Sequence, residues 1–155
     1  MAKPQDDSQP KYMHIEGKTQ YEMAQSIDAA FAAAEASIHH QSEEVALHWW
    51  YQQFELQIQE EFNVPDSCLP SGNVTNEQSF LQLYQALVKR TLQIQGDPKQ
   101  KLSAGITINL LLERSLLDAI DMMQAKQIWR FDLQRKLQTL QGRLINERPS
   151  PAASS

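Results

Sequence analysis

Apolar residues recur at helical spacing through four stretches of the 155-residue chain, and short runs of turn residues separate some of them. In the first stretch the apolar positions lie three or four residues apart, which places them on one face of an α-helix. Thr19 and Glu22 have the spacing of a capping box and predict the start of this helix. The positions on its apolar face are Met23, Ile27, Ala30, Phe31, Ala34 and Ile38.

A second apolar stripe follows after a short polar interval. No Gly or Pro occurs between residues 18 and 64, so one helix of more than 40 residues is possible. A turn near His39–Gln41 is the preferred alternative, because Ser42 followed by Glu43 and Glu44 is typical of a helix start. The second stripe contains Leu47, Tyr51, Phe54, Ile58 and Phe62, with Trp50 beside it.

The later helix boundaries are marked by turn and capping residues. Residues 63–74 hold two prolines and one glycine and predict a connection. Thr75–Gln78 is a second capping box, and Gly96 predicts the end of the helix that it starts. Asp97 as N-cap and Pro98 at the first helical position then predict a last helix that runs to about residue 147.

The last predicted helix carries two apolar rows that point in roughly opposite directions at about 100° per residue. If the core uses the first row, the second faces away from it and is available to another chain; the alternative is a kink near Trp129. We expect the second row to form a protein interface. The first row is Ile106, Leu110, Leu117, Ile120 and Phe131, broadened by Leu112, Leu116 and Met123, and the second is Leu133, Leu137, Leu140 and Leu144.

Trp49 is a further interface candidate. The aromatic residues between positions 49 and 54 span more than half of a helix circumference, so they cannot all face one small core. Trp49 is expected either to cap the edge of the core or to anchor a partner, a role for which Trp is favoured.

Composition supports an all-α fold. Only 5 of the 155 residues are Gly, whereas a β-sandwich or barrel needs frequent turns. We predict a small bundle of four to five helices with a long C-terminal helix. The expected organisation is a flexible tail at 1–18, a helical domain at 19–148 and a flexible tail at 149–155.

The chain has no apolar signal region at its start and no apolar run near the ~20 residues that a membrane span needs. Its single cysteine, Cys68, excludes an intramolecular disulfide framework. These features predict a soluble, cytoplasmic protein without membrane contact.

Charge is distributed unevenly along the chain. Residues 1–85 hold 3 basic and 13 acidic side chains, and residues 86–155 hold 11 basic and 6 acidic ones. The two halves either neutralise each other by packing or form a bipolar surface. On one ideal last helix Arg114, Lys136 and Arg143 lie within about 40° of one another, so they are candidate contacts to nucleic-acid phosphates. A sequence pI of about 5.3 argues against independent nucleic-acid binding.

No catalytic or cofactor motif is complete. The five glycines are too far apart for a phosphate-binding loop. His40, Glu44 and His48 have i, i+4, i+8 spacing, but no HExxH or ExxH sequence accompanies them. Cys68 has no histidine near it in sequence, and Glu113 is an acid on the apolar side of the last helix. We therefore predict no cofactor, no metal and no catalytic residue.

These observations favour a non-enzymatic helical interaction or accessory protein, a subunit or adaptor that binds a protein partner or a second copy of itself. The alternative is a small helical subunit of a nucleoprotein complex that contacts phosphates through its basic C-terminal half. An enzyme, based on the His/Glu cluster or Cys68, ranks third.

Overall fold

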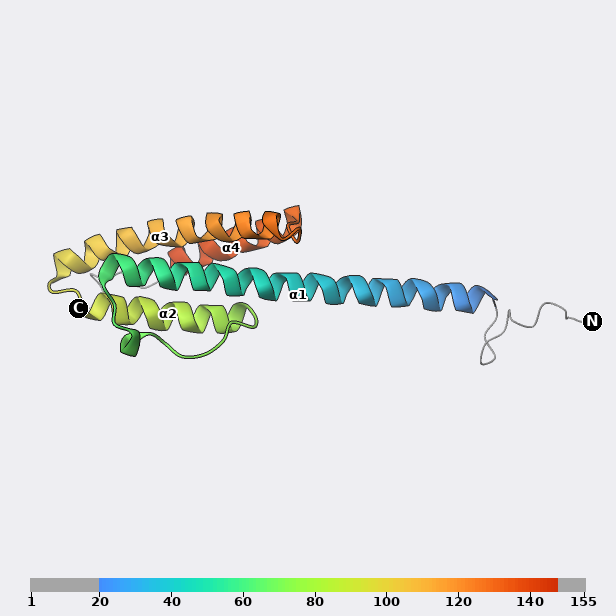
Figure 1. Cartoon of the computed structure of the whole chain (residues 1–155), viewed down its shortest axis with the longest axis horizontal. Helices are drawn as coiled ribbons and strands as arrows, with labels where there is room; N and C mark the ends of the chain where they lie inside the picture. The colour runs from blue at the N-terminus through green and yellow to red at the C-terminus, as the bar shows by residue number, and fades with distance from the viewer. Residues whose placement is uncertain (1–19, 148–155) are drawn as a thin grey trace, which may run out of the picture. The chain divides into compact units, whose positions relative to one another are not determined.

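The computed structural model describes residues 20–147, which form four α-helices and one short 3-10 helix (Figure 1). The all-α prediction is confirmed, and the helix count agrees with the predicted four to five. The predicted tails at 1–18 and 149–155, and Thr19 with them, lie outside the described residues. The elements are α1 (Gln20–Phe62), η2 (Asp66–Cys68), α2 (Glu77–Gln93), α3 (Pro98–Ala125) and α4 (Phe131–Glu147).

α1 is one continuous helix of 43 residues, so the turn predicted near His39–Gln41 is wrong. The stretch contains no Gly or Pro, and its alanines have the highest helix propensity. Ser42, the predicted cap of a separate helix, is instead buried within α1. The helix ends before Asn63, whose φ of 53° is the left-handed conformation that Asn tolerates at a helix end.

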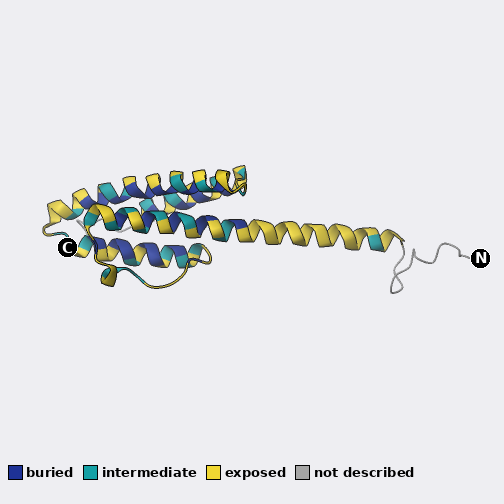
Figure 2. Cartoon of the chain, in the orientation of Figure 1, coloured by how far each residue is buried: buried dark blue, intermediate teal, exposed yellow. Residues whose placement is uncertain are grey.

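The chain divides into two compact units between Gln41 and Ser42. The single helical domain predicted at 19–148 stays a prediction. In the described part of the first unit, residues 20–41, every residue is exposed except Met23, which is half-buried (Figure 2). The second unit contains the rest of α1 and the other helices, and the buried hydrophobic residues form one core cluster there.

Trp50 lies at the centre of the second unit and joins three helices. Its indole Nε1 donates to the Leu112 carbonyl oxygen at 3.2 Å and to Ser115 Oγ at 3.1 Å, both on α3. Its ring lies 4.6 Å from that of Phe80 on α2. Because Trp50 is fully buried and its N–H is bonded, it contributes packing without leaving an unsatisfied polar group.

Polar caps fix the starts of α2 and α3. α2 begins with a capping box formed by Asn76 and Ser79, one residue later than the predicted Thr75–Gln78 box. α3 begins as predicted: Asp97 accepts a hydrogen bond from Gln100 N at 2.8 Å, and Pro98 occupies the first turn.

The predicted long C-terminal helix is wrong, because residues 126–130 separate α3 from α4. Gln127 has a φ of 60°, and Ile128 N donates to the Met123 carbonyl at 2.9 Å. A left-handed residue followed by this backward hydrogen bond is a Schellman ending. Gln rather than the usual Gly holds the left-handed position, so no glycine marks this helix end. The break falls where the alternative interpretation placed a kink, near Trp129. Ile128 packs against the core, an apolar contact that often accompanies this ending.

The break reverses the predicted roles of the two apolar rows. α4 packs beside α3 (Figure 1), and all four leucines of its row are at most 3% exposed. The expectation that Leu133, Leu137, Leu140 and Leu144 face away from the core is therefore wrong; they are core residues of the same chain. In the first row Ile120 is buried, as are the broadening residues Leu112, Leu116 and Met123, but its other members are exposed: Ile106, Leu110, Leu117 and Phe131.

Candidate interaction surfaces

The first candidate surface is the apolar face of α1 within residues 20–41. Ile27, Phe31 and Ile38 are 50%, 70% and 58% exposed, and they lie within about 40° of one another around the helix. The small side chains of Ala30 and Ala34 lie between them, so a second helix can approach closely. We name this set, Ile27, Ala30, Phe31, Ala34 and Ile38, the α1 face.

The charge around the α1 face has one sign. Residues 20–41 contain Glu22, Asp28 and Glu35 but no Lys or Arg. A partner with cationic residues beside its apolar contacts therefore fits this stretch better than an acidic one.

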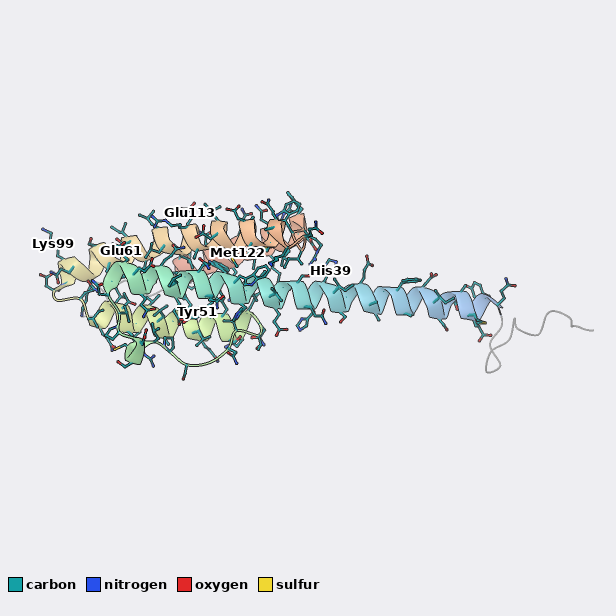
Figure 3. The ribbon with its side chains drawn as sticks, viewed as in Figure 1. His39, Tyr51, Glu61, Lys99, Glu113 and Met122 are labelled. Carbon is teal, nitrogen blue, oxygen red and sulfur yellow. The ribbon has the colours of Figure 1, made fainter. Side chains whose placement is uncertain are left out.

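The second candidate surface is the outer side of α3. Leu102, Ile106, Leu110 and Leu117 are 50–60% exposed and lie on one side of the helix. Glu113 lies in the same row and is exposed, at the outer edge of α3 (Figure 3). It is therefore a solvated carboxylate within an apolar row, and not a buried charge. We name the five residues the α3 row.

Trp49 is half-buried and packs against the core cluster. This is the position expected for an aromatic residue at the edge of the core. Its role as a partner anchor stays a prediction.

The candidate phosphate contacts do not form one cationic track. Arg114 lies on α3, whereas Lys136 and Arg143 lie on α4. The alignment predicted for them on one straight helix is therefore wrong. Lys136 Nζ donates to Glu43 Oε1 at 2.8 Å. Glu77 Oε2 lies 3.6 Å from Lys136 Nζ, and Glu77 Oε1 lies 3.6 Å from Arg143 Nη1.

These ion pairs neutralise part of the basic half with acids from the N-terminal half. They join α4 to the second part of α1 and to the first turn of α2. The hydrogen bond to Glu43 raises the pKa of Lys136, so its ammonium group stays charged. Between α4 and the start of α2 the surface forms an open hollow of about 500 Å³, lined in part by Glu77, Lys136 and Arg143. Two of the cations that line it, Lys136 and Arg143, are paired with carboxylates, and the third, Arg135, lies over the Phe131 ring. The paired carboxylates weaken the attraction of the hollow for a phosphate.

One pair of interacting titratable groups, the buried Tyr51 and the half-buried Glu55, lies outside these surfaces. Burial raises the pKa of the Tyr51 hydroxyl and, one helical turn later, that of the half-buried Glu55 carboxyl. Both groups belong to α1 and lie beside the core. After burial, the negative charge of Glu55 raises the pKa of Tyr51 further, whereas the hydrogen bond with Tyr51 lowers the pKa of Glu55 and the charge of Asp66 raises it.

The residues weighed above as metal ligands or nucleophile lie on α1, which carries His40, Glu44 and His48, and on η2, which carries Cys68. His40 and His48 are exposed, and no group of three His, Cys, Asp or Glu side chains within residues 20–147 is placed to hold a metal ion. Cys68 is half-buried in η2, where Arg90 donates a hydrogen bond to its carbonyl oxygen at 3.0 Å. This hydrogen bond links the connection between α1 and α2 to α2 itself, and it does not involve the Cys68 thiol.

The sequence analysis placed Ile106, Leu110 and Leu117 of the α3 row on the face expected to be buried, because it treated residues 98–147 as one helix. Glu113 was the available sign of the correct assignment, since an ionised carboxylate is costly to bury without a partner.

None of the helices within residues 20–147 combines the length and apolar character that crossing a membrane requires. No family model, curated protein or solved structure matches this chain.

Proposed function

We propose that the protein is a non-enzymatic helical interaction protein that acts as a subunit or adaptor of a larger assembly. The observation that carries this proposal is the exposure of the α1 face. A contiguous apolar patch on a protein surface is typical of a binding site, whereas single exposed apolar residues are common everywhere.

The α1 face fits a helix of another protein. Its apolar positions recur at helical spacing, which is how a helix docks on a helix or in a groove. Full burial of one such side chain is worth roughly 1.5–3 kcal/mol, so covering Ile27, Phe31 and Ile38 contributes several kcal/mol to binding. The acids beside the face favour a partner with Lys or Arg next to its own apolar row.

Replacing both Ile27 and Phe31 by Glu in one variant is expected to abolish partner capture and to leave the melting temperature nearly unchanged. Both side chains are exposed, so the substitutions remove binding surface and not core. The measurement is affinity capture from the native host with quantitative proteomics, together with circular dichroism of the purified variants.

The matched control is Ala29→Glu with Ala36→Glu. It adds the same two charges to the same helix, but on the opposite side, about 180° from Ile27. We expect it to retain the partners that the wild type captures. A role for the α1 face is contradicted if both variants lose partner capture equally. It is also contradicted if the Ile27→Glu, Phe31→Glu variant still captures its partners.

The competing nucleoprotein function predicts a different result. We expect no binding to duplex DNA or RNA at about 150 mM salt, because the net charge is −5 and two of the cations considered are paired with Glu43 and Glu77. Fluorescence anisotropy with labelled duplexes over a salt series measures this. Binding that persists at this salt, with a salt slope made shallower by Lys136→Gln and Arg143→Gln, favours the nucleoprotein function instead.

A further inference from the structure

The α3 row is a second apolar surface, separate from the α1 face. It extends from Leu102 to Leu117, about 22 Å along the helix. Its four apolar members lie on the side of α3 opposite the buried Ser115, which contacts Trp50. Because each of the four is at least half exposed, no other described element covers the row.

A lysine and an aspartate lie at the two ends of the row. Lys99 is in the first turn of α3, at the left end of the helix in Figure 3, and Asp121 is in its last turns; both are exposed. Both lie on the side of the helix that bears the row. Each charge has the sign that its own helix end disfavours, since the N-terminus of a helix is positive and the C-terminus negative.

The spacing of these residues is symmetric about the middle of the row. Leu110 lies 11 residues from Lys99 and 11 from Asp121. If two copies of α3 cross antiparallel at Leu110, Lys99 of each copy faces Asp121 of the other. Leu102 then lies opposite Leu117. A two-fold axis places the same patch on both partners, so each favourable contact occurs twice.

We propose that the α3 row is a self-association surface through which two copies of this protein form an antiparallel, two-fold symmetric dimer. The charges select this arrangement. Antiparallel pairing brings opposite charges together at both ends and places each beside the helix end that favours it. Parallel pairing would instead place Lys99 against Lys99 and Asp121 against Asp121, which is unfavourable.

Glu113 limits the strength of this dimer. In the antiparallel arrangement it lies near Ile106 of the second copy, where a carboxylate must turn toward solvent. The row therefore fits a reversible dimer better than a permanent one. Glu113→Leu is expected to strengthen association, because it completes the apolar row.

The test uses the full-length protein and sedimentation equilibrium over a concentration series. We expect a concentration-dependent dimer that Leu110→Glu weakens by at least about tenfold, because it places two carboxylates against each other at the symmetry axis. The matched control is Leu56→Glu, the same substitution at a leucine on α1 that is 49% exposed, and it is expected to dimerise like the wild type. Circular dichroism verifies that each variant is folded.

Cysteine crosslinking tests the orientation in a Cys68→Ser background. Leu110→Cys is expected to form an intermolecular disulfide, because the axis brings the two positions together. Lys99→Cys is expected to crosslink only when mixed with Asp121→Cys. Three results would overturn the proposal. They are crosslinking of Lys99→Cys to itself, a monomer at every concentration, and a dimer that Leu110→Glu leaves unchanged.

The two proposals can fail independently. Ile27→Glu with Phe31→Glu is expected to leave the dimer intact, and Leu110→Glu is expected to leave partner capture through the α1 face intact. Loss of the dimer in the first variant only would assign self-association to the α1 face, which contradicts the role of the α3 row.

Discussion

Replacing both Leu137 and Leu140 by Asp in one variant is expected to unfold the bundle formed by residues 42–147. Both side chains are at most 3% exposed and pack in the core. Truncating a buried leucine costs about 2–5 kcal/mol, and an unpaired buried carboxylate adds a further penalty. Two such changes together are comparable to the whole stability of a typical domain, about 5–15 kcal/mol.

Far-UV circular dichroism and thermal melting measure this effect. The matched control is Leu56→Asp with Ile94→Asp, which introduces two acids at apolar residues that are about half exposed. We expect this control to melt close to the wild type. If the Leu137/Leu140 variant kept its helicity and its melting temperature, α4 would not pack on the core as described here.

Trp50→Ala is expected to destabilise the bundle by about 3–5 kcal/mol, as for other large-to-small substitutions in a core. The change removes the largest fully buried side chain and its contact with Phe80. Trp50→Phe is expected to cost less, because an aromatic ring remains and Ser115 Oγ still donates to the Leu112 carbonyl at 2.8 Å.

Urea unfolding, monitored by circular dichroism, gives the free energy of unfolding of each Trp50 variant. Trp129→Ala is the control: this Trp is 38% exposed, and its Nε1 bonds to the Gln134 side chain at the surface. We expect a cost of at most about 1 kcal/mol there, as for other changes at the surface. A larger cost for Trp129 than for Trp50 would mean that the core is not centred on Trp50.

Exposed apolar faces on two different helices suggest how the protein can act in an assembly. The α1 face belongs to the first unit and the α3 row to the second. In the functions proposed here, the first binds another protein and the second binds another copy, so that one dimer presents two copies of the α1 face. Two linked sites bind a partner with repeated sites more tightly than one site does.

The sequence by itself determined the helical fold and most of its boundaries. Helical spacing of apolar residues, scarce glycine and the Asp97–Pro98 start are local features, and local backbone preferences act on them directly. The start of α2 was predicted within one residue, because Thr75, Asn76 and Ser79 are all residues that favour a helix start.

Only the tertiary structure decided which apolar face is buried. The rows of α3 and α4 point in opposite directions on one continuous helix, and a single left-handed residue, Gln127, removes that continuity. Gln has no marked preference for this conformation, so the residues at the break do not mark it. The two opposed rows indicated a kink near Trp129 only as one of two alternatives. After the chain reverses, the leucines of α4 pack in the core, and Ile106, Leu110 and Leu117 are left at the surface. The burial of a helix face depends on where the next helix packs, and periodicity within one helix does not contain that information.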